Sequence, residues 1–395
     1  MKFTIIGIND NKDYPLPQEV RDIIYRGQVF SGGKRHHELM AHLLPEHYQW
    51  IDITVPLSEV FHQYQPHEHV IVFASGDPLF FGFANTVRRN LPDAEITLFP
   101  AFNSLQMLAH RLLIPYHDMR IVSLTGRPWH EFDRALIEGC GKIGVLTDGT
   151  HTPAAIAERM LDYGYHDYRM TVGEHLGNPE KERVRECTLK ETASLEFSQP
   201  NCLILTGSHQ RRWGIPDHEF ELLNGRERMI TKMPIRLLSL QALELPRKQV
   251  MWDIGFCTGS ISIETRLQFP HLHVVAFEIR EEGRHLMETN ARRFGAPGID
   301  FHIGDFLTTD TTTLPQPDAV FIGGHGGKLC EIMKKAAEVL LPGGCIVMNS
   351  VTEESKNLFM DACQTLGLEL CDSPMQITIN AYNPIEILKC KKLES

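Results

Sequence analysis

Acidic side chains close two short apolar runs in the C-terminal part of the sequence. Asp253 lies near the end of the run Val250–Ile254, and Glu278 directly follows the run Val274–Phe277. The ends of the next two runs hold Asp305, Phe306, Gly323 and Gly324. Because the carboxyl ends of parallel strands meet at one edge of a sheet, we expect these residues to line one ligand site.

A glycine-containing turn joins the first of these runs to a helical pattern, but it differs from the turn of a dinucleotide-binding fold. That fold needs G-x-G-x-x-G, in which the middle glycine lets the backbone approach a pyrophosphate. Here the middle position is Cys257. The rest of the turn consists of Gly255, Phe256, Thr258 and Gly259. The turn therefore suits a ligand that carries no pyrophosphate.

The side chains around the turn indicate what that ligand contains. A carboxylate such as Asp253 can accept from an ammonium group, and the free N–H groups of a helix N-terminus can bind a carboxylate. Glu278 can accept from both hydroxyls of a ribose, as acidic residues do in NAD sites. Asp305 can accept from an exocyclic amine, and Phe306 can cover a ring. These groups describe S-adenosylmethionine (SAM), which we predict as the cofactor; NAD is the competing interpretation, and Cys257 counts against it.

The elements that position these residues alternate between strands and helices, which predicts the α/β class in two domains. Residues 1–206 form the first domain, with a largely parallel sheet, and residues 207–230 lose the alternation and form a linker. The strands expected in the first domain are Phe3–Ile8, Val70–Ala74, Arg120–Leu124, Lys142–Leu146 and Cys202–Leu205. Helices are expected at Gln18–Tyr25 and Ser104–Leu113.

Residues 231–395 form the second domain, in which the alternation restarts. Its expected strands are Val250–Ile254, Val274–Phe277, Asp300–Ile303, Ala319–Ile322 and Cys345–Asn349. The expected helices begin at Met233, Ser260 and Glu353, and two further helices end at Phe294 and Leu341. The last two extended runs, Met375–Asn380 and Ile385–Lys389, are close enough to pair as an antiparallel hairpin at the sheet edge.

Composition limits the partners and the location of the chain. A net charge of −11 argues against a general nucleic-acid binder, which would present a basic face. No apolar run approaches the ~20 residues that span a bilayer, and the first apolar run reads as a buried strand, not a signal peptide. The nine cysteines include no C-x-x-C pair, which predicts free thiols in the cytoplasm. His37 and His42 miss the i, i+4 spacing of a helical zinc site, so we expect no metal.

Longer stretches of the sequence resemble two kinds of methyltransferase. "VMWDIGFCTGSISIE", "AFEIRE", "IGDF", "FIGGHGG" and "LPGGCIVMNSVTEE" are similar to the C15-methylating, decarboxylating enzymes of precorrin-6B metabolism. "FASGDPLFFG", "FPAFNSLQMLAHRL", "VSLTGRP" and "VGEHLGNPEKERVRE" resemble the C5-methylating members of the tetrapyrrole methylase family. The chain as a whole thus resembles the family of fused precorrin-6Y C5,15-methyltransferases of cobalamin biosynthesis. The resemblance implies a tetrapyrrole-methylase-type α/β domain followed by a Rossmann-like class I SAM methyltransferase domain.

The resemblance also implies a SAM site in the first domain. It consists of Gly76, Asp77, Pro78, Ser104 and the loop at residues 147–148. In the second domain, Thr231 joins the residues predicted to bind the cofactor. Family members usually carry a glycine-proline-glycine loop after the first strand, whereas residues 7–17, "GINDNKDYPLP", keep only Gly7 of it. The first domain therefore either methylates C5 or binds the tetrapyrrole without transferring a methyl group.

The implied substrate is a tetrapyrrole, a precorrin or cobalt-precorrin, whose many carboxylates favour guanidinium partners. The residues predicted to bind it are Arg226, Arg228, Lys232, Arg236, Gly323 and Gly324, with Lys34, Arg35, Arg88 and Arg89 as candidates in the first domain. Methyl transfer from a sulfonium needs an oriented carbon nucleophile and no nucleophilic Ser or Cys, so no catalytic residue is assigned. We also expect a homo-oligomer, and the presence of cobalt and the order of the two methylations stay open.

Overall fold

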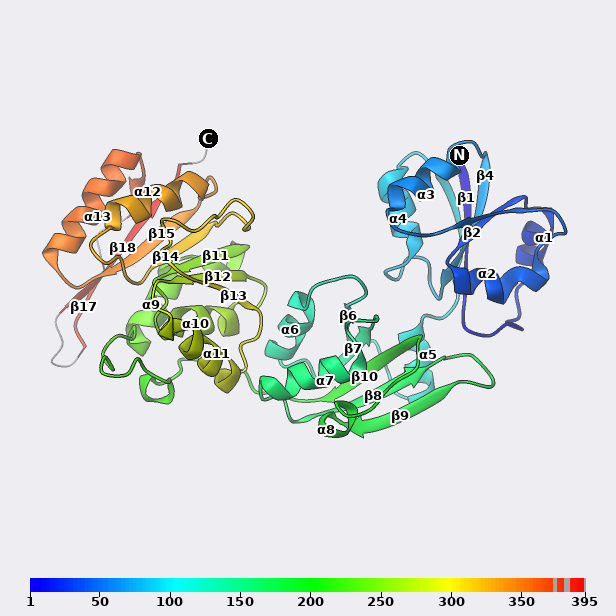
Figure 1. The fold of residues 1–395 in the computed structure, drawn as a ribbon, viewed down its shortest axis with the longest axis horizontal. Helices are drawn as coiled ribbons and strands as arrows, with labels where there is room; N and C mark the ends of the chain where they lie inside the picture. The colour runs from blue at the N-terminus through cyan, green and yellow to red at the C-terminus, as the bar shows by residue number, and fades with distance from the viewer. Residues whose placement is uncertain (372–374, 380–383, 394–395) are drawn as a thin grey trace. The chain divides into compact units, whose positions relative to one another are not determined.

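The computed structural model describes residues 1–371, 375–379 and 384–393. Contacts within the chain divide it into two compact units (Figure 1). The first unit comprises residues 1–127, 141–158 and 168–207, and the second comprises residues 128–140, 159–167 and the chain from Ser208 onward. The sequence predicted residues 207–230 as a linker. Residues 208–230 pack into the second unit and place Ile215, Phe220 and Ile230 in its core.

The first unit contains a five-stranded parallel sheet. Its order is β3 (Gln49–Asp52), β2 (Val29–Gly32), β4 (His69–Ser75), β1 (Lys2–Ile8) and β5 (Glu95–Phe99). One face packs on α1 (Gln18–Arg26) and α2 (Lys34–Met40), and the other on α3 (Leu57–Tyr64) and α4 (Phe83–Asn90). Because both faces are covered, β1 and β4 are almost continuously apolar, and this pattern predicted both strands correctly.

A second five-stranded sheet completes the first unit, and it corrects the expectation of a single, largely parallel sheet. Its order is β6 (Arg120–Ser123), β7 (Lys142–Leu146), β10 (Asn201–Gly207), β8 (Tyr168–Glu174) and β9 (Arg183–Thr188). Strand β10 runs antiparallel to β7 and β8, and β8 runs antiparallel to β9. The chain returns from β8 to β9 without a helix, which is the connection that antiparallel neighbours allow. The remaining helices in this part of the chain are α5 (Ser104–Leu112), α6 (His130–Ile137), α7 (Pro153–Asp162) and α8 (Leu189–Thr192).

The second unit is a Rossmann-like α/β sheet, as predicted. Its order is β13 (Ile299–Ile303), β12 (His273–Glu278), β11 (Val250–Ile254), β14 (Ala319–Ile322), β15 (Cys345–Ser350), β18 (Ile385–Lys391) and β16 (Glu369–Leu370). All pairs from β13 to β15 are parallel. One face packs on α12 (Leu329–Val339) and α13 (Glu353–Leu366), and the other on α9 (Met233–Ala242), α10 (Ser260–Gln268) and α11 (Glu282–Phe294) (Figure 1).

The predicted C-terminal hairpin is present. Strand β17 (Met375–Ile377) pairs with β18 in antiparallel register, with Met375 opposite Ile387. Asn380, which ended the predicted first strand of the hairpin, lies outside the described residues. Strand β18 also pairs with β15, so the hairpin extends the parallel sheet and does not stand apart from it. Within the described part of the chain, no helix is long and apolar enough to cross a membrane.

Candidate functional site

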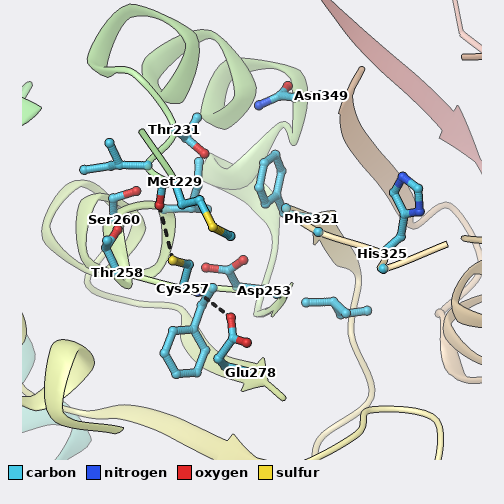
Figure 2. A pocket seen from close by; sticks show the side chains of 18 of the residues that line it. Met229, Thr231, Asp253, Cys257, Thr258, Ser260, Glu278, Phe321, His325 and Asn349 are labelled. Carbon is cyan, nitrogen blue, oxygen red and sulfur yellow. Dashed lines mark hydrogen bonds between the residues drawn. The ribbon is translucent and has the colours of Figure 1, made fainter. Parts of the chain in front are cut away.

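The second unit has a cavity of about 680 Å³ at the carboxyl ends of its parallel strands (Figure 2). Cavities of this size commonly hold small-molecule ligands and cofactors. The predicted residues that line it are Arg228, Thr231, Lys232, Asp253, Gly255, Phe256, Cys257, Thr258, Glu278, Asp305, Phe306, Gly323 and Gly324. The rule that functional residues gather at the strand ends therefore located most of the candidate site.

Two glycines let the turn after β11 pack closely. Gly255 has a φ of 81°, and a Cβ there would lie 2.8 Å from the backbone of Gly324. Gly259 has a φ of 74°, and a Cβ there would lie 2.7 Å from Sδ of Met287. Because both positions are left-handed and crowded, only glycine fits without strain. Gly259 thus shapes the turn but does not line the cavity.

Cys257 adopts a φ of 50°, a left-handed conformation that side chains other than glycine rarely take. Its amide N–H donates to Oε2 of Glu278 over 2.9 Å, and its thiol donates to the carbonyl of Met229 over 3.2 Å (Figure 2). Burial, together with the charge of Glu278, raises the pKa of Cys257 to about 11. The thiol therefore stays protonated near neutral pH and joins the turn to the segment before α9.

Asp253 is fully buried at the end of β11, and one of its two oxygens has no partner. Its Oδ2 accepts from the hydroxyl of Ser262 over 2.6 Å, whereas Oδ1 has no hydrogen-bond partner among the described residues. Burial raises the pKa of Asp253 to about 7, and the nearby charge of Glu278 adds to this effect. A cation at Oδ1 would offset both costs, so the site fits the ammonium group that the sequence predicted.

Glu278 is held in one orientation at the end of β12, where only 2% of the residue is exposed. Its Oε2 accepts from the N–H of Cys257 over 2.9 Å, and its Oε1 accepts from the N–H of Arg280 over 3.0 Å. Nη1 of Arg280 also donates to Oε1 over 3.2 Å. A carboxylate has about four acceptor positions, so about one remains for a ribose hydroxyl, and a second becomes free when the Arg280 side chain, which is 37% exposed, moves away. The turn after β11 and the end of β12 thus position this carboxylate together.

Asp305 and Phe306 line the cavity in different ways. Asp305 accepts from the N–H of Leu307 and forms an ion pair with Lys328 over 3.0 Å, and these contacts hold its pKa below the usual value. Phe306 is 5% exposed, and its ring packs against that of Phe277 at a centroid distance of 5.0 Å. Phe306 therefore closes the cavity wall and offers little free ring surface.

Arg236 corrects one prediction about substrate binding. Its side chain is fully buried and donates to Glu264 over 3.2 Å, to the carbonyl of Ile215, and to Asp217 over 3.4 Å. It faces away from the cavity because α9 packs on α10, which carries Glu264. Arg226 is exposed and does not line the cavity either, so Arg228 and Lys232 are the basic residues of this cluster that do.

Some cavity residues were not anticipated from the sequence. They include Met229, Ser260, Phe321, His325 and Asn349 (Figure 2). Asn349 near the end of β15 follows the same strand-end rule as Asp253, which would have found it. Its Oδ1 accepts from the hydroxyl of Ser239 over 3.1 Å, and its Nδ2 has no partner among the described residues.

The first unit has its own cavity, of about 500 Å³, beside the carboxyl ends of β1 and β4. Gly76 and Ser104 line it, as the resemblance implied, but Asp77 and Pro78 do not. Asp77 instead accepts from the N–H of Leu79 over 2.8 Å and stabilises the turn. The loop at residues 147–148 also lies outside the cavity wall. Of the basic candidates, Arg35 lines the cavity and Arg89 lines a shallow depression next to it.

The segment that departs from the glycine-proline-glycine pattern contributes an ion pair to this cavity. Asp10 accepts from Arg35 over 2.7 Å and from Nδ1 of His175 over 2.9 Å. Its side chain is 9% exposed. Asn9 and Asp10 both line the cavity, so polar side chains occupy a wall where the usual loop has none.

Two family models match different stretches of this chain. Residues 11–193 match the family described as Tetrapyrrole (Corrin/Porphyrin) Methylases, and residues 224–387 match the family described as Precorrin methyltransferase domain. A precorrin-6Y C(5,15)-methyltransferase [decarboxylating] of Sinorhizobium sp is 33% identical over 97% of this chain and 91% of that protein. A cobalt-precorrin-6B C(15)-methyltransferase (decarboxylating) of Salmonella typhi is 34% identical over 44% of this chain and 94% of its own.

Two solved structures are each similar to about half of this chain. A precorrin-6Y C5,15-methyltransferase from Geobacter metallireducens GS-15 is 29% identical, with a TM-score of 0.42, and covers 46% of this chain and 100% of its own. A precorrin-6Y methylase from Archaeoglobus fulgidus is 20% identical, with a TM-score of 0.40, and covers 53% of this chain and 99% of its own. On the identity to the Sinorhizobium protein over almost its whole length, the chain belongs to the family of decarboxylating precorrin-6Y C(5,15)-methyltransferases.

Proposed function

We propose that the chain uses SAM to methylate C5 and C15 of precorrin-6Y, or of its cobalt form, and removes the ring-C acetate carboxyl as CO2 in cobalamin biosynthesis. The observation that carries the proposal is the unpartnered Oδ1 of Asp253 in a cavity that Glu278 also lines. Together they offer an acceptor for an ammonium group and acceptors for a ribose. The family match over both units extends the proposal to the whole chain.

Each unit is assigned one methylation. The domain of residues 1–206 would methylate C5 with a cofactor site at Gly76 and Ser104, and the domain of residues 231–395 would methylate C15 and decarboxylate. Residues 207–230 would form the boundary between the two domains, and residues 208–230 of this segment pack with the second unit. Each unit has a cavity of its own, which supports two separate cofactor sites.

The residues of the second cavity bind and orient, and no nucleophilic side chain is needed. SAM supplies a methyl group that leaves a neutral thioether. Asp253 would accept from the ammonium group of SAM, and Glu278 would accept from its ribose hydroxyls. Arg228 and Lys232 line the same cavity and would bind substrate carboxylates, and Lys232 also forms an ion pair with Asp217 over 3.6 Å. Holding the carbon nucleophile in line at ~3–3.5 Å supplies several kcal/mol of the rate enhancement.

A second function is favoured by the ion pair at Asp10. Because polar side chains occupy the wall next to β1, the first unit would then bind the tetrapyrrole without methylating it. Only C15 methylation and decarboxylation would remain.

Product mass distinguishes the two proposals. The full-length chain is incubated with SAM and precorrin-6Y, and in parallel with the cobalt form. Two added methyl groups with loss of CO2 support the bifunctional enzyme, whereas one added methyl group with loss of CO2 supports the second function. A substrate that gains no methyl group contradicts both.

We also propose that the protein acts in the cytoplasm as a homo-oligomer. The nine cysteines are free thiols, which suits a reducing compartment. Trp213 and Leu113 are 73% and 91% exposed, which suits contacts between copies. Sedimentation velocity tests the oligomer, and a monomer at micromolar concentration contradicts it.

A further inference from the structure

The mouth of the cavity in the first unit carries exposed aromatic side chains. Phe81 and Phe102 line the cavity and are 45% and 58% exposed. Phe81 has a φ of 54°, in the left-handed region that bulky residues avoid. Residues held in such strained conformations cluster at ligand-binding and active sites. The exposed ring therefore suits contact with a large apolar ligand.

Arg127 lies over the ring of Phe81. Its guanidinium carbon is 5.0 Å from the ring centroid, and Nη1 donates to the hydroxyl of Ser123 over 2.6 Å. Among the described residues, no carboxylate lies within ion-pair distance of Arg127, although the side chain lines the cavity and is exposed. A guanidinium has five donors, so several N–H groups remain available to an anionic ligand.

Ser75 offers a hydroxyl proton at another part of the same wall. Its Oγ lies 2.9 Å from Nη2 of Arg35 and 2.9 Å from Nε2 of His36. Nδ1 of His36 accepts from the N–H of Gly33 over 3.2 Å, which leaves the ring proton on Nε2. Burial, together with the charge of Arg35, lowers the pKa of His36 to about 4, so the ring is neutral at pH 7.

Both neighbours of Ser75 therefore donate to its oxygen. Arg35 has only donors, and the tautomer of His36 makes Nε2 a donor as well. The single hydroxyl proton of Ser75 must point away from both, and Ser75 is an exposed residue that lines the cavity. The charge of Arg35 is offset by Asp10, whereas that of Arg127 is not, so Arg127 is the stronger anion partner.

We propose that Arg127 on Phe81, together with the hydroxyl of Ser75, forms a subsite that binds carboxylates at the edge of a large, flat, apolar ring. Given the proposed function, on which this inference rests, that ring is the tetrapyrrole substrate. Two separated donors select a ligand with at least two carboxylates, and Phe81 contacts the ring face. The carboxylate of SAM is the other source of the same chemistry, and the experiment distinguishes the two.

The test uses the full-length chain and four variants: Arg127→Ala, Arg127→Lys, Ser75→Ala and the control Arg26→Ala. Arg26 is an exposed arginine at the end of α1 in the same unit, and it lines neither cavity of that unit. C5 methylation and C15 methylation are followed separately by product mass and fragmentation. The C15 reaction is assigned to the other unit, so it reports whether the rest of the chain is intact, and the KM for SAM in the C5 reaction reports whether the first unit is folded.

We expect Arg127→Ala to raise the KM for the tetrapyrrole in C5 methylation by about 10- to 100-fold, the cost of one charge-assisted contact. Ser75→Ala should raise it by about 3- to 10-fold. The KM for SAM and the C15 reaction should change less than about twofold. Arg127→Lys should restore only part of the loss, because an ammonium cannot stack or bind bidentately as a guanidinium does.

Several results would overturn the subsite. One is an unchanged KM for the tetrapyrrole in Arg127→Ala, and another is a rise in the KM for SAM alone, which would assign the residues to the cofactor carboxylate. Titration of the full-length chain with precorrin-6Y without SAM measures binding directly. The wild type could bind the tetrapyrrole at two sites and methylate only C15, and the proposed C5 activity would then be wrong. Loss of one of the two binding sites in Arg127→Ala would still support the subsite. Equal isotherms for wild type and variant contradict it.

Discussion

Binding of the cofactor to the second unit should release a proton near neutral pH. Asp253 is fully buried, its Oδ1 lacks a partner among the described residues, and burial raises its pKa from 3.8 to about 7. An ammonium group at Oδ1 favours the charged carboxylate and returns its pKa toward the ordinary range. The proton that Asp253 carries in the free protein is then lost on binding.

The size of the release follows from the pKa of the free protein. With a pKa near 7, binding should release about three quarters of a proton at pH 6.5, about a quarter at pH 7.5 and almost none at pH 8.5. The same shift has a consequence for folding. The folded state binds the proton on Asp253 more tightly than the unfolded state does. Protonation of Asp253 therefore contributes roughly 4 kcal/mol to the free energy of unfolding below about pH 4, and this contribution is lost as the pH rises through 7.

Titration calorimetry with S-adenosylhomocysteine, in buffers of different ionisation enthalpy, measures the proton count. The matched variant is Asp253→Asn, which keeps an acceptor for Ser262 but cannot titrate. It should bind more weakly, by about 30-fold or more, and should lose the pH-dependent release. Wild type that releases no proton at pH 6.5, or a release that persists in Asp253→Asn, would refute the assignment of Asp253 to the ammonium group.

Three further predictions concern the second unit. Glu278→Gln places an amide N–H₂ near the N–H of Cys257. Calorimetry should therefore show at least about a tenfold weaker affinity for S-adenosylhomocysteine, and an unchanged affinity contradicts the role of Glu278 in binding the ribose. The pKa of Cys257 is raised to about 11, so iodoacetamide at pH 8 should alkylate this thiol at least about tenfold more slowly than the exposed Cys330. Peptide masses measure the two rates, and equal rates contradict the raised pKa. Arg236→Ala leaves Glu264 buried without its cationic partner, so the free energy of unfolding in urea should fall by about 3–5 kcal/mol. A change below about 1 kcal/mol would contradict the structural role.

Strands buried on both faces could be read directly from the sequence. Val250–Ile254 and Ala319–Ile322 were predicted at their observed bounds, because a parallel strand covered by helices on both sides needs apolar residues throughout. The polar strand Arg183–Thr188 escaped prediction, since its side chains are mostly exposed or only half-buried and leave no apolar pattern. The antiparallel arrangement of the second sheet also depends on strand partners, which a local pattern does not reveal.

The sequence by itself determined the Rossmann-like order of the second unit and brought Asp253 and Glu278 to one cavity, because strand-end positions follow from chain direction alone. Tertiary structure decided which side chains reach a ligand. Arg236 lies in a basic cluster yet faces Glu264 in the core. Arg127, to which no sequence pattern gave a role, lines the cavity of the first unit. Periodicity fixes the face of an element on which a residue lies, but the partner of that face is set by the packing of elements distant in sequence.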